Sequence, residues 1–117
     1  MKLQIDGQKL RVRVDEEEFS QLLGGAAVEV RTHFADAFVI HFALRTTAAQ
    51  EPGFDGRSNE WRICLPATDL HAHAARLPTR DGLRYRLAGK DGAAPLELLF
   101  DVDVRDSAKR RRSRTDP

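Results

Sequence analysis

Apolar and polar residues alternate along much of the chain, and this alternation predicts paired strands. Residues 3–14 alternate around an Asp6-Gly7 turn signal, so they predict a hairpin with one buried face. A longer hairpin is predicted around a three-residue loop at 35–37, because the apolar residues on both sides of that loop share one parity. These residues are Val28, Val30, Thr32, Phe34, Phe38, Ile40, Phe42 and Leu44.

Two short helices are predicted between the strands. The first follows Asp15, a good N-cap whose spacing to Glu18 matches a capping box, and Gly24-Gly25 would end it. The second lies between Pro66 and Pro78, with residues 70, 73, 74 and 77 at helical spacing. Strands at 83–87 and 96–104 complete the pattern.

The second half of the chain repeats the order of the first. An offset of 51 residues superimposes Leu10 on Trp61 and continues without a gap through the helix, and a four-residue insertion follows. We predict an internal duplication of one β-α-β-β unit, although any two such units would also align by alternation alone. Neither unit can close a core by itself, so both should pack around one core. The alignment places 10–23 on 61–74, 28–31 on 83–86, 38–44 on 96–102 and Ile5-Asp6-Gly7 on Phe54-Asp55-Gly56.

The predicted fold class is α+β, with a mostly antiparallel sheet or a small barrel built from the two repeats and two short helices. One globular domain is expected at 1–105. It would consist of repeat one at 1–45, a connection at 46–53 and repeat two at 54–105, followed by a disordered basic tail at 106–117.

Composition limits the class of protein. With 41% hydrophobic and 32% charged residues in a chain of 117, an ordinary globular domain is expected. No apolar run approaches the roughly 18 residues that span a bilayer, and residues 1–6 do not fit a secretory signal, so we expect a cytoplasmic protein without membrane contact. Cys64 is the single cysteine, which excludes an internal disulfide and any multi-cysteine zinc site.

Charge is distributed unevenly along the chain. The net charge is +1, but the last twelve residues hold five basic and two acidic side chains, so they contribute +3 and residues 1–105 carry −2. Weak, non-specific nucleic-acid binding is therefore expected of the tail more than of the folded domain. The candidate residues are Lys109, Arg110, Arg111, Arg112 and Arg114.

A second basic candidate lies on the predicted strands, where five arginines occupy outer faces. They could contact nucleic acid, but Glu29, Glu60 and Glu97 are interleaved with them, and mixed charges usually indicate a solvated sheet face. The arginines are Arg11, Arg13, Arg62, Arg84 and Arg86.

Other reactive side chains predict no catalytic residue, metal or cofactor. His33 and His41 would be diagonal neighbours on the polar face of the long hairpin, without carboxylates or thiols nearby. His73 replaces an apolar residue of the buried helix stripe and is interpreted as a satisfied, partly buried structural histidine. Asp101 and Asp103 share a face of the last strand that should lie in water, where they would protect a sheet edge.

Several segments resemble a family of short bacterial proteins of unknown function across roughly residues 1–105. They are Met1-Lys2-Leu3-Gln4-Ile5-Asp6-Gly7, Leu10-Arg11-Val12-Arg13-Val14, Gly24-Gly25-Ala26-Ala27-Val28-Glu29, Trp61-Arg62-Ile63-Cys64-Leu65-Pro66 and Leu96-Glu97-Leu98-Leu99-Phe100. The resemblance implies no activity and no site residues. The chain differs from that family in its basic C-terminal end, where members typically end in an acidic segment. The strand and helix pattern also resembles the transition-state-regulator (AbrB-like) swapped-hairpin proteins and double-psi barrels.

The expected function is therefore a non-enzymatic binding or interaction module of a bacterial cytoplasm, with an unknown protein partner or a second copy as its partner. The alternative is an AbrB-like nucleic-acid-binding regulator that uses the basic tail or the strand arginines. An enzyme would require a deep pocket with converging polar groups, and the sequence contains no motif for one.

Overall fold

The computed structural model describes residues 1–104, which form eight strands and two helices and confirm the α+β class. The first half contains β1 (Lys2–Asp6), β2 (Lys9–Asp15), α1 (Glu16–Leu23), β3 (Val28–Phe34) and β4 (Phe38–Thr47). The second half contains β5 (Gly53–Arg57), β6 (Glu60–Pro66), α2 (Ala67–Ala74), β7 (Leu83–Leu87) and β8 (Leu96–Asp103). The basic tail and its five candidate residues lie outside the described residues.

Helix α1 begins as its sequence predicts. The Asp15 side chain accepts a hydrogen bond from the Glu18 backbone at 2.7 Å, and the Glu18 carboxylate accepts one from the Asp15 backbone at 3.0 Å. The N-terminal ammonium group of Met1 also donates to Glu18, at 2.8 Å, which ties the start of β1 to this helix. Helix α2 starts after Pro66 without a side-chain cap.

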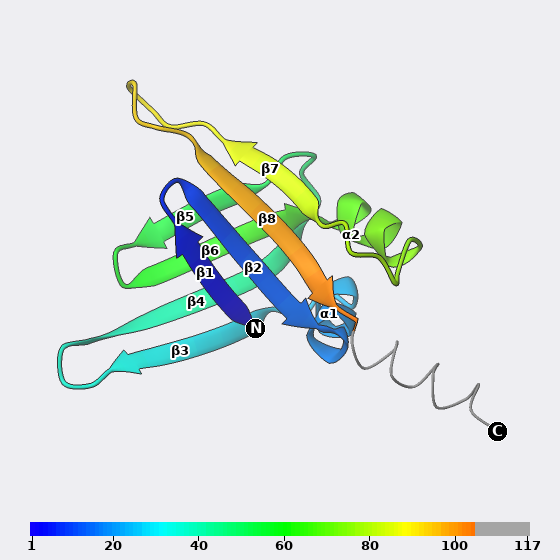
Figure 1. Ribbon diagram of the computed structural model, residues 1–117, viewed down its shortest axis with the longest axis horizontal. Coiled ribbons are helices and arrows are strands. Elements are labelled where there is room, and N and C mark those ends of the chain that lie inside the picture. The colour runs from blue at the N-terminus through cyan, green and yellow to red at the C-terminus, as the bar shows by residue number, and fades with distance from the viewer. Residues whose placement is uncertain (105–117) are drawn as a thin grey trace.

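The strands form two open sheets of four, and each sheet takes one hairpin from each half of the chain. Sheet A has the order β1-β2-β8-β7, and sheet B has the order β3-β4-β6-β5. Each is antiparallel except at its centre, where β2 pairs with β8 and β4 pairs with β6 in parallel. Sheet A lies across sheet B, and both helices lie at one end of the pair (Figure 1). Of the two arrangements expected, the mostly antiparallel sheet is confirmed and a closed barrel does not form.

The hydrophobic core lies between the sheets and under the helices. It combines alternate residues of the central strands with Phe19 and Leu22 from α1 and Leu70 from α2. Because each half contributes to both sheets, side chains from both halves are needed to fill it. The strand residues of the core are Leu10, Val12, Val14, Val28, Phe42, Leu44, Ile63, Leu65, Leu98, Phe100 and Val102.

The two halves correspond element by element. Adding 51 to the bounds of β1, β2 and α1 gives the bounds of β5, β6 and α2. The same offset converts the pairing of Lys2 with Arg13 into that of Gly53 with Cys64. Offsets of 55 for β3 and 56 for β4 reproduce the remaining pairings in β7 and β8. Each half is therefore β-β-α-β-β, one strand more than the predicted unit.

Part of the predicted alignment is wrong by two residues. The pairings place Phe42 on Leu98, whereas the sequence alignment placed it on Phe100. The match of Ile5-Asp6-Gly7 to Phe54-Asp55-Gly56 fails too, because Gly7 lies in a turn and Gly56 lies within β5. A shift of two keeps every side chain on the same face of a strand, so alternation cannot distinguish the two alignments.

His73 is buried more deeply than its sequence suggests. It is 1% exposed and packs edge-on against Phe19, and its ring Nε2 has no hydrogen-bond partner among the described residues. The expectation of a satisfied, partly buried histidine is therefore wrong, because the ring is almost fully buried and only its Nδ1 has a polar neighbour, an Arg76 nitrogen at 3.5 Å. Burial and the nearby charge of Arg76 lower the pKa of His73, against a smaller opposing effect of Asp101.

We predict that His73→Leu stabilises the protein, because it places leucine where the first half has Leu22 and removes an unsatisfied polar atom. A gain of about 1–3 kcal/mol is expected in urea unfolding. The pKa of His73 is lower in the folded state than in the unfolded state. Its contribution to stability is therefore complete above about pH 6.5 and is lost as the pH falls below that value.

The loss of stability between pH 7.5 and pH 5 should therefore be smaller in His73→Leu than in the wild type. The exposed His71→Gln on the same helix is the control and should leave the pH dependence unchanged. Equal pH dependence in His73→Leu and wild type would contradict the assignment.

Candidate anion-binding face

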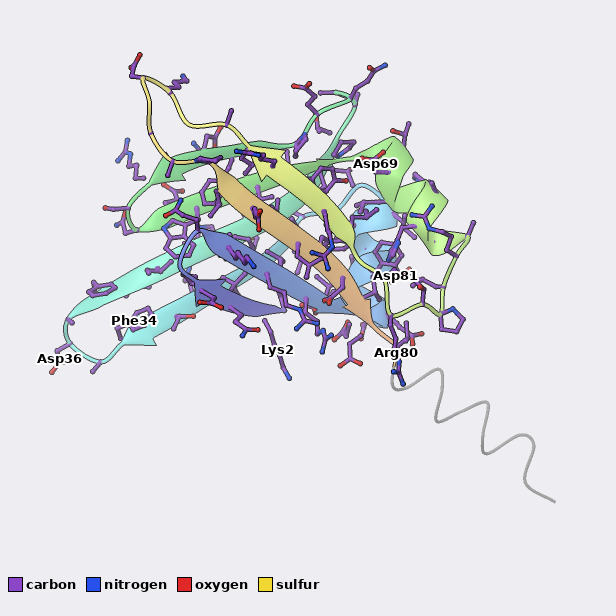
Figure 2. The ribbon with its side chains drawn as sticks, turned by 45° about the horizontal axis from the view of Figure 1, so that its top comes forward. Lys2, Phe34, Asp36, Asp69, Arg80 and Asp81 are labelled. Carbon is purple, nitrogen blue, oxygen red and sulfur yellow. The ribbon has the colours of Figure 1, made fainter. Side chains whose placement is uncertain are left out.

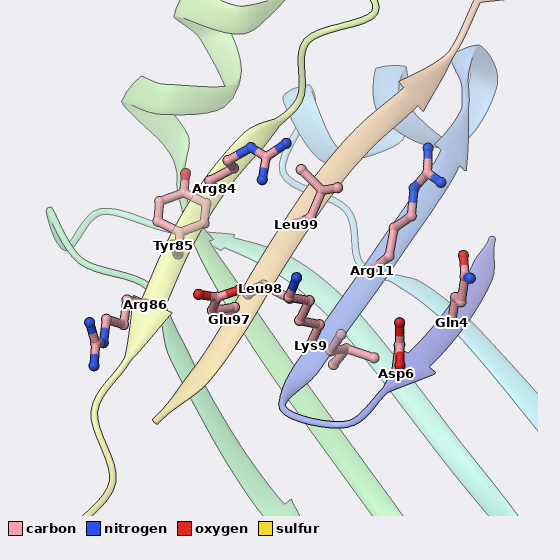
Figure 3. A pocket seen from close by; sticks show the side chains of 11 residues that line it. Gln4, Asp6, Lys9, Arg11, Arg84, Tyr85, Arg86, Glu97, Leu98 and Leu99 are labelled. Atoms are coloured by element: carbon pink, nitrogen blue, oxygen red, sulfur yellow. The ribbon is translucent and has the colours of Figure 1, made fainter. Parts of the chain in front are cut away.

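The outer face of sheet A, which faces away from the core, is hollowed. A depression of about 470 Å³ extends over all four strands and is open to solvent (Figure 3). Outward side chains form most of its lining, and four basic and two acidic residues among them give it a net charge of +2. The charged residues are Asp6, Lys9, Arg11, Arg84, Arg86 and Glu97.

Strand register arranges these side chains in rows that cross the sheet. The middle row is Gln4, Arg11, Leu99 and Arg84, in the order β1, β2, β8 and β7. The row beside it is Asp6, Lys9, Glu97 and Arg86, in which acidic and basic residues alternate. The middle row therefore carries two positive charges and no negative charge.

The two arginines of the middle row lie on either side of Leu99 (Figure 3). Arg84 is exposed and forms no hydrogen bond or ion pair with another described residue. Leu99 is only partly buried, so an apolar side chain separates the two guanidinium groups. A cationic, apolar, cationic sequence of groups thus crosses the sheet, with Arg84 exposed and Arg11 partly buried.

Arg11 also contacts a buried carboxylate. Asp101, 6% exposed, accepts hydrogen bonds from Arg11 at 2.6 Å and from Arg13 at 3.0 Å. Burial by itself would raise the pKa of Asp101, but the hydrogen bonds from Arg13 and Arg11 outweigh it and hold the pKa below its ordinary value. One carboxylate is thus shared by two arginines at this end of the face.

The expectation that Asp101 lies in water at a sheet edge is wrong. Strand β8 is central, with β2 on one side and β7 on the other, and the long side chains of Arg11 and Arg13 from β2 cover Asp101. Asp103, on the same face, is partly buried.

The structure brings together four of the five strand arginines proposed from the sequence. Arg11, Arg13, Arg84 and Arg86 all lie on the outer face of sheet A, whereas Arg62 lies on sheet B. The sequence missed Leu99 and Gln4 as members of the same face. Alternation identified each as outward, but it gave no sign that β1, β2, β8 and β7 are neighbours.

The corresponding row of sheet B has a net charge of −1. It consists of Asp55, Arg62, Ala43 and Glu29, and Arg62 donates a hydrogen bond to Asp55 at 2.9 Å. Gln4 of sheet A takes the place of Asp55, and Arg84 takes the place of Glu29. The two acidic positions of the sheet B row are therefore neutral and basic, respectively, in sheet A.

Comparison with known families agrees with the resemblance found in the sequence. A family model described as "Family of unknown function (DUF7009)" matches residues 1–104. The chain belongs to this family. No curated protein matches the chain. In this DUF7009 member, the matched segment spans all ten structural elements, so the family is defined by both halves of the fold.

The remaining candidate side chains of this DUF7009 protein lie apart from the basic face. His33 is opposite Val39 and His41 is opposite Arg31 on sheet B, as predicted. The expectation of no carboxylate nearby is wrong, because the His41 Nε2 lies 3.5 Å from a Glu29 oxygen. Within residues 1–104, no three His, Cys, Asp or Glu side chains are grouped to hold a metal ion. None of the helices in that range has the length and apolar character to cross a membrane.

We predict that Asp101→Asn destabilises the protein by about 1–3 kcal/mol, because it leaves two guanidinium groups without their buried acceptor. The pKa of Asp101 is lowered by folding, so its contribution is present above about pH 4 and is lost as the pH falls through the folded-state value. Chemical denaturation should show the largest difference from wild type near neutral pH and a smaller one near pH 3.

Asp55→Asn is the matched control, since it also removes a strand aspartate that pairs with an arginine. Asp55 and Arg62 are largely exposed, so a change below about 0.5 kcal/mol is expected. Equal effects of the two substitutions would contradict the role assigned to burial at Asp101.

Proposed function

We propose that the protein is a non-enzymatic binding module and that the outer face of sheet A binds an extended, acidic segment of a partner protein. The observation that carries the proposal is the middle row, in which Arg11 and Arg84 flank Leu99 without an acidic residue between them. The hollow around it has a net charge of +2, although residues 1–105 together carry −2. Positive charge is thus concentrated on one face, which favours an anionic ligand.

The shape of the face supports an extended ligand. A second depression of about 310 Å³ shares Asp6, Lys9, Arg86 and Glu97 with the first, so the two adjoin toward the 88–95 loop. Both are open to water, whereas small-molecule sites usually enclose most of their ligand. The same openness argues for binding in place of catalysis, because catalytic polar groups act best where water is excluded.

An acidic peptide suits this face better than a nucleic acid. Sheets that bind single strands use outward aromatic side chains for base stacking, and the outer face of sheet A has none within residues 1–104. Tyr85 on β7 points inward, where its hydroxyl donates to Asp69 at 2.8 Å. Leu99 between two arginines instead suits an apolar side chain flanked by carboxylates.

Nucleic-acid binding is the second candidate, and the observation that favours it is the charge of the chain's C-terminal end. Five basic residues at 109–114 follow β8, a central strand of sheet A. Contacts from these side chains alone would be electrostatic and independent of base sequence.

We also infer that the two halves arose by duplication. Three observations support this origin: the elements of the two halves are related by nearly constant offsets, their strands pair in the same way, and both helices have eight residues. Sheet B is then a second copy of the same surface that has a different charge pattern, and it provides control positions for sheet A.

We predict that Arg84→Gln weakens binding of a fluorescein-labelled ten-residue glutamate peptide about tenfold, as expected for one lost charge-assisted hydrogen bond of about 1.5 kcal/mol. Fluorescence anisotropy at low salt measures it. The control is Arg31→Gln, which removes an exposed arginine from edge strand β3 of sheet B and should leave binding unchanged.

Equal losses in both variants would show non-specific attraction and contradict the proposed face. A labelled single-stranded DNA of similar charge separates the two candidate functions. If DNA binds more tightly than the peptide, and a chain ending at Arg105 loses that binding, the basic tail is the functional feature.

A further inference from the structure

Strand β1 is an exposed edge with an apolar inner side. It pairs with β2 only, so its other side has no partner strand among the described residues. Ile5, on the inner face, is 62% exposed, the highest value among the large hydrophobic residues that are exposed. Unpaired edge strands with exposed apolar residues are sites at which another strand can be added.

Beside this edge, the β3–β4 hairpin projects past sheet A (Figures 1 and 2). Phe34 and Phe38 lie near its tip on the inner face, with ring centroids 4.9 Å apart. They are 45% and 54% exposed, although Phe42 and Leu44 on the same face are buried. The hairpin is therefore apolar where sheet A has no strand to cover it.

The sequence of β1 is complementary to itself. If two copies of β1 pair antiparallel and centred on Gln4, Lys2 of each copy lies opposite Asp6 of the other, and Leu3 lies opposite Ile5. The two charge pairs lie on the outer face, and the apolar pairs lie on the inner face above the projecting hairpins. Opposite charges and apolar residues directly across an antiparallel pair stabilise it.

The other edge strands lack this property. Centred self-pairing of β5 places Asp55 opposite Asp55, β3 places Arg31 opposite Arg31, and β7 places Arg84 opposite Arg86. Like charges directly opposite are destabilising. The tip that corresponds to Phe34 and Phe38 in the second half carries Gly89 and Ala94, so it offers no aromatic surface.

We propose that the protein forms a two-fold symmetric dimer through antiparallel pairing of β1 with β1 of a second copy. The contact joins two copies of sheet A into one eight-stranded sheet, and it covers Ile5, Phe34 and Phe38. A two-fold contact is closed, so each β1 edge gains a partner strand and the assembly stops at two copies. Both basic faces then lie on the same side of the joined sheet, but the dimer does not depend on what those faces bind.

Sedimentation equilibrium of the full chain over a wide concentration range tests the dimer. Lys2→Asp and Asp6→Lys each place like charges opposite one another twice, and each should raise the dimer dissociation constant by about tenfold or more. The double variant Lys2→Asp/Asp6→Lys restores opposite charges and should return the constant to near its wild-type value. Arg57→Asp, at the β5 position that corresponds to Asp6, should have no effect.

The hairpin is tested separately by Phe38→Ser, which should also weaken the dimer. Circular dichroism of each variant reports folding, and recovery in the double variant shows that the single variants fail through charge. A wild-type monomer at every concentration would overturn the proposal. A dimer insensitive to both single reversals, or one that the double variant does not restore, would equally rule out the centred β1 register.

Discussion

The parallel pairing of β2 with β8, and of β4 with β6, joins segments that lie far apart in the chain. Leu10 lies opposite Leu98, so the contact at the centre of sheet A forms only when both ends of the domain meet. Each half supplies a hairpin to each sheet, and its helix carries the chain from one sheet to the other. Neither half can bury its own apolar faces, and the core between the sheets therefore requires both.

The same pairing creates the basic face. It places the outward side chains of β2 beside those of β8 and β7, and Arg11 thereby meets Leu99 and Arg84 across neighbouring strands. In sheet B the equivalent pairing produces a row that contains Arg62 but has a net charge of −1. One backbone arrangement thus supports two faces of different charge, because outward side chains contribute little to the core and are free to differ.

Open sheets leave edges, and the edges of this protein are not equivalent. Strand β1 combines a self-complementary sequence with exposed apolar side chains beside it. Strand β5 instead has an aspartate, Asp55, at its centre, and this aspartate accepts a hydrogen bond from Arg62. The projecting hairpin of β3 and β4 carries two phenylalanines that a monomer leaves exposed. Association through β1 is consistent with the projecting hairpin, because Ile5 of β1 and the two phenylalanines of the hairpin are exposed on the same side of the molecule.

The sequence by itself determined the local features of the fold. The Asp15 and Glu18 spacing predicted the start of α1, because a capping box involves residues only three apart. Alternation predicted the three-residue loop of the long hairpin and the outward direction of the arginines, because strand geometry alone decides which face a residue occupies.

Only the tertiary structure decided which strands are neighbours. Alternation repeats every two residues, so it fixed the face of Phe42 but misplaced its counterpart by two. The burial of Asp101 depends on Arg11 and Arg13 from a strand at the other end of the chain, and the exposure of Phe34 and Phe38 depends on where sheet A stops. The alternation of apolar and polar residues depends on neighbouring positions in the chain, whereas the burial of a side chain depends on segments that are distant in the sequence.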